Sequence, residues 1–174
     1  MLDAEELVVS TRNRGTIVRW VSAEEVQETY EVRAVLEGHA ARLAAERITA
    51  EQLAALRRLD RQMKRTVDEQ RAVGDEYVRT LGGLNAEFHQ TIAVATGNRV
   101  LARTMASLLN TPLYARAYYA YSDPRKRASI SDHDRMIELL AAGDADACEQ
   151  FWREHLYRGR DYIIEHLRAK EAGE

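Results

Sequence analysis

Cysteine, proline and glycine are all scarce in this chain of 174 residues, which contains one cysteine, two prolines and nine glycines. A single cysteine, Cys148, excludes an intramolecular disulfide and a thiolate metal cluster, and it favours a reducing compartment. Sheets need many turns, and the low glycine and proline content provides few of them. The chain is therefore predicted to be mostly helical.

Long hydrophobic runs are also missing. No segment approaches the roughly 18 consecutive apolar residues of a membrane-spanning helix, and the N-terminus carries acidic residues where a signal peptide carries basic ones. Hydrophobic residues make up 45% and charged residues 30%, and the net charge of −3 argues against a surface built for nonspecific binding to nucleic acid or anionic lipid. We predict a cytoplasmic globular protein with no membrane partner.

Helical signals begin at Ser22 and continue to the C-terminus. Ser22 with Glu25, and Thr49 with Gln52, have the spacing of capping boxes, which satisfy free amide groups in the first turn of a helix. Gly143 is placed to end one helix and Asp144 to cap the next. The helices are expected at about 22–47, 49–71, 75–95, a short segment after 98, a tyrosine-rich segment (Tyr114, Tyr118, Tyr119, Tyr121) stopped at 122–124, about 125–142, and 144–168. The predicted fold class is all-α, an antiparallel bundle of six or seven helices.

The first twenty residues differ from the rest. Two short β-branched runs, Leu7–Ser10 and Thr16–Trp20, flank a turn that contains Asn13 and Gly15. This pattern predicts one β-hairpin. Because an isolated hairpin is only marginally stable, it must pack on another part of the protein.

Three of the five histidines are predicted to point inward from three different helices. His89 shares a helix face with Asn85 and Ile92, whereas His133 and His155 each lie in an apolar stripe. Taken singly, each histidine could be a buried neutral ring that donates to a backbone carbonyl. Taken together, a shared metal would satisfy all three, because imidazole suits Zn, Ni, Cu or Fe. The oxygen of Asn85 is a candidate fourth ligand.

The spacing alone leaves both interpretations open. No H-E-x-x-H motif is present, and no histidine has a glutamate three residues before it, which argues against a zincin and a ferritin-like di-iron bundle. The remaining histidines, His39 and His166, are predicted to have structural roles.

A series of motifs runs through nearly the whole chain, from about Ser22 to Leu167. In order they are Tyr30-Glu-Val-Arg33-x-x-Leu36-Glu37, Leu84-Asn85-x-x-Phe88-His89-x-x-Ile92, Ala95-Thr-Gly-Asn98-x-x-Leu101, Ser131-x-His133-x-x-Ile137, Gly143-Asp144-Ala-Asp146-Ala and His155-Leu156. Together they resemble the C-terminal, effector-binding FCD domain of FadR-like regulators in the GntR family of transcription regulators.

That resemblance implies a metal site and an effector. Many FCD domains hold a divalent metal through an Asp or Asn, a histidine four residues later, and two histidines 22 residues apart. The matching residues are Asn85, His89, His133 and His155. Zinc is the metal most expected, with nickel and other divalent ions as alternatives. The family's effectors are small carboxylates and sugar acids bound at or beside the metal, and Arg33 matches an arginine that faces this pocket. The alternative for Arg33 is a surface salt bridge with Glu37, four residues on.

The asparagine departs from the more common aspartate. Three neutral imidazoles and an amide oxygen leave the full +2 charge of a divalent ion, so we hypothesise weaker metal binding and a greater dependence on an anionic effector.

Residues 1–20 resemble the end of the family's winged helix-turn-helix, with Arg12 and Arg14 at the tip of the wing hairpin as remnants of a DNA contact. Residues 21–170 correspond to the FCD domain. The helices that precede the recognition helix are missing, so DNA binding is expected only in a full-length form. By the same resemblance the protein is expected to form a homodimer.

We predict a ligand sensor and not an enzyme. Three histidines and an open metal position can also activate water, but Glu87 points away from His89 and no nucleophile with a partnered base is evident. A metal-dependent enzyme and a purely structural metal site are the alternatives.

Overall fold

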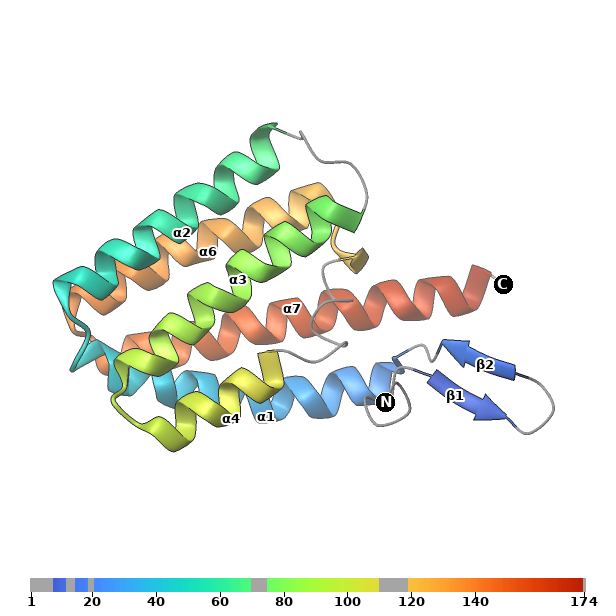
Figure 1. The fold of residues 1–174 in the computed structure, drawn as a ribbon, viewed down its shortest axis with the longest axis horizontal. Helices are drawn as coiled ribbons and strands as arrows, with labels where there is room; N and C mark the ends of the chain where they lie inside the picture. The colour runs from blue at the N-terminus through green and yellow to red at the C-terminus, as the bar shows by residue number, and fades with distance from the viewer. Residues whose placement is uncertain (1–7, 12–14, 19–20, 70–74, 110–118, 174) are drawn as a thin grey trace.

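The computed structural model describes residues 8–11, 15–18, 21–69, 75–109 and 119–173. Within these ranges the protein is a bundle of six helices with one two-stranded hairpin (Figure 1), which confirms the predicted fold class. The helices are α1 (Ala23–Ala45), α2 (Ala50–Glu69), α3 (Asp75–Ala95), α4 (Arg99–Leu109), α6 (Asp123–Ala142) and α7 (Ala145–Gly173).

The helices form two layers. Helices α1 and α7 lie against each other over most of their length and run in opposite directions, while α2 packs against α3 and α6 (Figure 1). Helix α3 also contacts α1, and α6 contacts α7, so these contacts join the layers. The interior between them is where side chains from α1, α3, α6 and α7 meet.

Both predicted capping boxes are present. Glu25 N donates to Ser22 Oγ at 3.1 Å and Ser22 N donates to Glu25 Oε2 at 2.9 Å. The same reciprocal pair joins Thr49 and Gln52, at 3.0 and 3.2 Å. These side chains satisfy amide groups that a helix leaves without intrahelical partners, which fixes where α1 and α2 begin.

The turn from α6 to α7 also follows its sequence signals. Gly143 has φ of +71°, the left-handed conformation that glycine adopts without a steric penalty, and it ends α6. Asp144 Oδ1 accepts from Ala147 N at 3.0 Å and caps α7. Helix α7 continues to Gly173, beyond its expected end at 168. The start of α6 also differs from expectation. Ser122 is the N-cap of α6, with Pro124 tolerated in its first turn, so residues 122–124 open α6 two residues earlier than predicted.

The predicted hairpin is present as β1 (Val8–Thr11) and β2 (Gly15–Val18), antiparallel with Val8 opposite Val18. Its expected basic tip, Arg12 and Arg14, lies outside the described residues. The predicted tyrosine-rich helix also lies mostly outside them, including Tyr114 and Tyr118.

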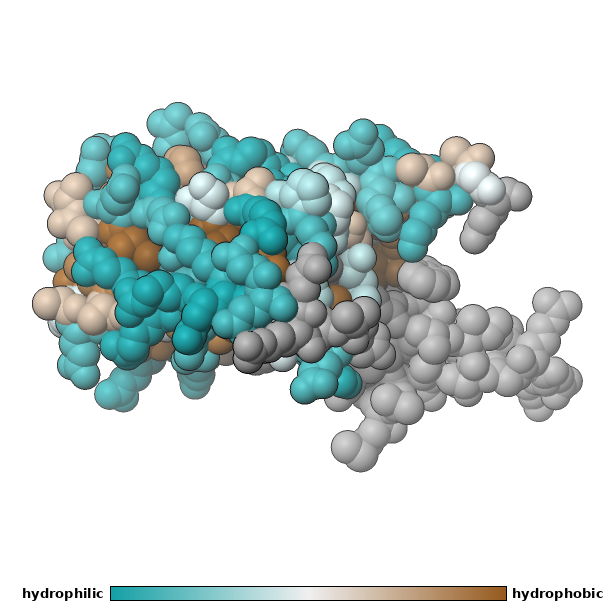
Figure 2. Space-filling view, turned by 90° about the horizontal axis from the view of Figure 1, so that it is seen from above, coloured by the Kyte–Doolittle hydropathy of each residue, from teal (hydrophilic) through white to brown (hydrophobic). Residues whose placement is uncertain are grey.

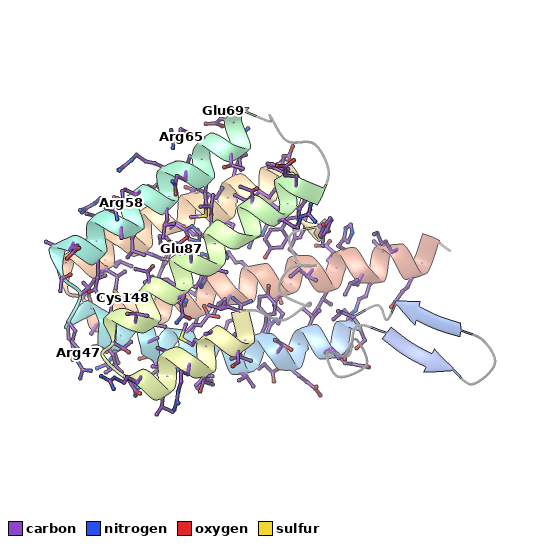
Figure 3. All side chains as sticks on the ribbon, viewed as in Figure 1. Arg47, Arg58, Arg65, Glu69, Glu87 and Cys148 are labelled. Atoms are coloured by element: carbon purple, nitrogen blue, oxygen red, sulfur yellow. The ribbon has the colours of Figure 1, made fainter. Side chains whose placement is uncertain are left out.

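The hydrophobic core runs through the whole bundle. It is built from large side chains such as Leu56, Met63, Phe88, Met136 and Trp152, each at most 1% exposed. The face shown in Figure 2 is mostly hydrophilic, with hydrophobic side chains visible in the furrows between charged ones. On α2, Arg58, Arg65 and Glu69 mark the outward side of the helix (Figure 3).

Candidate metal centre

His89 on α3, His133 on α6 and His155 on α7 meet in the interior of the bundle. Their ring centroids are 5.5 to 5.9 Å apart, and one ligand nitrogen from each lies within 4.8 Å of the others. All three are buried, with exposed fractions of 1%, 0% and 5%. The fold therefore brings the three inward-pointing histidines together, as their helical positions predicted.

Aromatic packing fixes the orientation of two of these rings. Phe88 stacks on His133 with centroids 4.2 Å apart, and Trp152 meets His89 edge-on at 5.2 Å. Asn85, the fourth predicted ligand, is buried one turn before His89 on the same face of α3. Both rings are thus held between apolar neighbours, where their polar nitrogens require partners.

The Nδ1 atom of His89 has such a partner in Glu37 of α1. Glu37 Oε2 lies 2.5 Å from His89 Nδ1 and accepts from Trp152 Nε1 at 3.2 Å, while Glu37 Oε1 accepts from Arg33 Nε at 2.7 Å. Burial opposes ionisation of Glu37, but Arg33 and His89 outweigh it and hold the pKa of the carboxyl well below its usual range. Glu37 is therefore an ionised carboxylate inside the core.

His155 is held in a similar way from the edge of the site. Its Nδ1 lies 2.9 Å from Asp132 Oδ2, and the same oxygen accepts from Arg158 Nη2 at 2.9 Å. Burial raises the pKa of Asp132, but the hydrogen bonds from His155 and Arg158 prevail and lower it. A carboxylate bound to Nδ1 leaves Nε2 of the same ring available to a metal.

His133 differs from both. Neither of its ring nitrogens has a hydrogen-bond partner among the described residues, and His89 Nε2 also lacks one there. Burial and the neighbouring His155 and His89 hold the pKa of His133 well below its ordinary value, and burial lowers the pKa of His155 to about 4. Both rings are neutral at pH 7, the form that binds a metal.

Arg33, the predicted effector contact, is buried on α1 and only 3% exposed. Its guanidinium lies 4.6 Å above the centre of the Tyr30 ring. The predicted pairing with Glu37 exists, but the alternative that placed it on the surface is wrong, because this face of α1 packs against α3 and α7.

Two carboxylates that bond to these histidines, Glu37 and Asp132, were not predicted from the sequence as their partners. Glu37 carried a signal, since it lies on the α1 face otherwise formed by Ala34, Ala41 and Ala44, where a charge needs a buried partner. Asp132 carried none, because it is adjacent to His133 in sequence but bonds to His155 on another helix.

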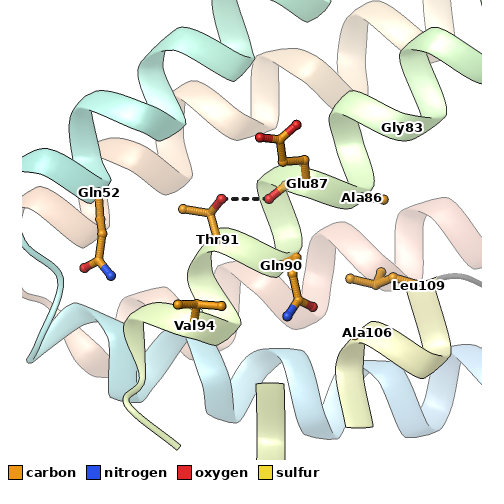
Figure 4. Close-up of a pocket in the computed structure, with 9 residues that line it drawn as sticks. All are labelled: Gln52, Gly83, Ala86, Glu87, Gln90, Thr91, Val94, Ala106 and Leu109. Atoms are coloured by element: carbon orange, nitrogen blue, oxygen red, sulfur yellow. Dashed lines mark hydrogen bonds between the residues drawn. The ribbon is translucent and has the colours of Figure 1, made fainter. Parts of the chain in front are cut away.

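The outer side of α3 forms a separate cleft of about 440 Å³ (Figure 4). It is lined by Gln52, Gly83, Ala86, Glu87, Gln90, Thr91, Val94, Ala106 and Leu109. Glu87 is exposed on this side, whereas His89 faces inward. No histidine is among the described residues that line the cleft, so the candidate metal centre lies in the interior and not here.

Comparison with known proteins identifies relatives of the chain. The FCD domain family matches residues 28–158. The Nta operon transcriptional regulator of Aminobacter aminovorans is 30% identical over 168 residues, which cover 97% of this chain and 75% of that protein. By its name, this relative is a transcriptional regulator. In the described part of the chain, no helix has both the length and the apolar character needed to cross a membrane.

Solved structures share the fold. McbR/YncC of E. coli aligns with a TM-score of 0.76 at 20% identity, covering 94% of this chain and 80% of that one. A GntR-family regulator from Pseudomonas syringae pv. tomato aligns with a TM-score of 0.65 at 23% identity, covering 99% and 69%. With a family match over most of its length, the chain belongs to the FCD domain family.

Proposed function

We propose that this chain is the sensing part of a GntR-family regulator, and that it binds a small carboxylate or sugar acid at a divalent metal inside the bundle. The proposed ligands are Asn85, His89, His133 and His155. The observation that carries this proposal is His133, a fully buried ring with no hydrogen-bond partner for either nitrogen among the described residues. A buried polar group of this kind is costly unless a ligand satisfies it.

The donor set fits zinc. Neutral imidazoles and an amide oxygen are ligands that Zn²⁺ accepts, and Ni²⁺ or other divalent transition metals accept them too. The carboxylates bound to Nδ1 of His89 and of His155 orient these rings as in established zinc sites. When bound, the metal supplies a positive charge and a coordination position that can bind an effector oxygen.

The surrounding charges favour an anionic effector. Glu37 is paired with Arg33, and Asp132 is paired with Arg158, so each nearby carboxylate already has a cation beside it. The ligands themselves are neutral, which leaves the +2 charge of the ion to be balanced by the effector. In this proposal Arg33 adds positive charge to the effector-binding side of the site.

We further propose that DNA recognition requires a full-length, homodimeric and cytoplasmic regulator with a complete winged helix-turn-helix. Residues 1–20, including Arg12 and Arg14, would belong to that DNA-binding part, and residues 21–170 to the sensor. Effector binding would shift the balance between two arrangements of the dimer, as in any allosteric switch.

Metal titration tests the proposal. Zinc should bind the wild-type protein with a stoichiometry of about one per chain, and His133→Ala should abolish this binding. Asn85→Asp should bind zinc more tightly but gain less from an added carboxylate, because an aspartate lowers the charge that the anion balances. Equal zinc binding by wild type and His133→Ala would refute the metal site.

A further inference from the structure

Arg125 occupies the first turn of α6, on the side of that helix that leads to His133. Ser129 lies four residues after Arg125 and four residues before His133, and it is buried. Residues spaced by four lie on neighbouring positions of a helix face. Arg125 therefore extends the inner face of α6 beyond the histidines.

The guanidinium of Arg125 differs from that of other arginines near the site. Its Nε and Nη2 atoms are buried, and neither has a hydrogen-bond partner among the described residues. Arg33 and Arg158, by contrast, donate to Glu37 and Asp132. A buried cationic donor without an acceptor is unfavourable by itself, and an anion would satisfy it.

The guanidinium of Arg125 packs against two tyrosine rings and approaches α7. The guanidinium carbon lies 5.3 Å from the centre of the Tyr121 ring and 5.9 Å from that of Tyr162. Its Nη2 lies 3.9 Å from the position that a Cβ atom on Gly159 would occupy. Gly159 is one helical turn after His155 on α7, which corresponds to a rise of about 6 Å.

Gly159 makes room for neighbouring side chains of α1 and α6. A Cβ atom at this position would lie 2.7 Å from the Tyr121 hydroxyl, closer than real contacts allow. The missing side chain thus lets the Tyr121 hydroxyl and the guanidinium of Arg125 approach the turn of α7 next to the histidine centre.

We propose that Arg125 binds a second carboxylate of the effector, so that the sensor selects short diacids, including sugar diacids, over monoacids. This inference rests on the proposed function, in which the first carboxylate lies at the metal. The planar guanidinium matches a carboxylate with two parallel hydrogen bonds, and Nε and Nη2 are the pair of atoms that such a contact uses.

Calorimetric titration of the zinc-loaded protein with glutarate and butyrate tests this inference. The two acids have similar lengths, but only glutarate carries a second carboxylate. Wild type should bind glutarate at least tenfold more tightly than butyrate. Arg125→Gln should lose this preference while its affinity for butyrate and for zinc stays unchanged, and Arg125→Lys should retain part of it.

Arg135→Gln is the matched control, since it removes the same charge from the same helix at an exposed residue paired with Glu138. It should keep the full preference for glutarate. Thermal unfolding without ligand gives a second measurement, in which Arg125→Gln should be at least as stable as wild type, because the buried Nε and Nη2 donors have no hydrogen-bond partner among the described residues.

The outcomes separate the two proposals. An unchanged glutarate preference in Arg125→Gln, or no preference in wild type, overturns the role of Arg125. Zinc binding without any binding of either acid also overturns it and leaves the metal site standing. Failure of the wild type to bind zinc overturns the proposed function itself.

Discussion

Two buried polar groups in the interior of the bundle, Glu37 and His133, differ in their hydrogen bonding. Around Glu37, both carboxylate oxygens accept hydrogen bonds, from Arg33, His89 and Trp152. At His133, whose ring centroid lies 5.8 Å from that of His89, neither ring nitrogen has a hydrogen-bond partner among the described residues. Both groups are fully buried, with exposed fractions of 1% for Glu37 and 0% for His133.

In the proposed function, this difference distinguishes a structural group, Glu37, from a metal ligand, His133. A buried charge with a complete set of partners stabilises the fold as it stands, whereas a buried ring without partners costs free energy until something binds to it. The Glu37 group should therefore matter most for folding, and His133 should matter most for binding.

The largest effect is expected from Glu37→Gln, which removes the charge that Arg33 and His89 face. Breaking a buried ion pair from one side typically costs about 3–5 kcal/mol, because the other charge remains buried without compensation. Chemical denaturation of the metal-free protein measures this loss. Glu28→Gln, at an exposed position of the same helix, is the control and should change stability by less than about 0.5 kcal/mol. A loss at Glu37 no larger than at Glu28 would contradict the structural role.

The next effect concerns His133. Zinc at 1,000 times its dissociation constant should stabilise the wild type by about 4 kcal/mol, because a ligand that binds only the folded state adds its binding free energy to the stability. His133→Ala should show no stabilisation by zinc. His39→Ala is the control, since His39 is exposed on α1, and it should respond to zinc as wild type does. A zinc response retained in His133→Ala would show that this ring binds no metal.

The next effect is the pH dependence of the stability of the metal-free protein. It should be slightly smaller than the stabilisation by zinc. The pKa of His155 is about 4 in the folded protein against its ordinary 6.5, mainly because of burial. As the pH falls below 6.5 the unfolded chain gains a proton at this residue and the folded protein does not, so stability is lost between about pH 6.5 and 4. The difference between the two pKa values of His155 corresponds to a loss of about 3 kcal/mol in the free energy of unfolding.

Denaturation in a chelating buffer at several pH values measures this loss. His133 acts in the same direction, since its pKa is also lowered by burial. Glu37 contributes only below its ordinary value of 4.5, where the unfolded carboxyl takes up a proton first. His155→Leu should therefore flatten the curve between pH 6.5 and 4 without removing the loss at lower pH. If the stability of the wild type does not change between pH 6.5 and 4, the conclusion that the buried histidines are neutral is refuted.

Local signals made the helices predictable. The capping boxes at Ser22 and Thr49, and the left-handed Gly143, act within four residues of chain, so their outcome depends little on the rest of the protein. The boundary at Ser122 was missed because a serine followed by proline suits the end of one helix as well as the start of the next.

The site was predictable only in part. Helical periodicity placed His89, His133 and His155 on inner faces, which is a property of each helix alone. Pairing one helix with another is not encoded in that periodicity, and so Asp132 could not be assigned to His155 from the sequence. The pairing of Arg33 with its neighbour Glu37 was expected only as a surface alternative, and the burial of the pair depends on how α3 and α7 cover α1.

The smallest predicted effect belongs to Asp132, which supports His155 without being a proposed ligand. Asp132→Asn keeps a hydrogen-bond acceptor beside Nδ1 of the ring but loses the negative charge, so zinc affinity should fall about 10- to 100-fold. Competition with a chromogenic chelator measures this change. Asp134→Asn, two residues further along α6, removes the same charge from an exposed residue paired with Lys64 and should leave zinc affinity within about twofold of wild type.

The pair of variants also distinguishes orientation from general electrostatics. If Asp132 acted only as a nearby negative charge, both variants would weaken zinc binding, and high salt would reduce the difference from wild type. If it acts by fixing the His155 ring, only Asp132→Asn is affected, and salt changes little because the contact is partly buried. A zinc affinity unchanged in Asp132→Asn would mean that His155 is oriented by packing alone. His155 would then resemble His133 and His89, whose rings are held by packing against Phe88 and Trp152.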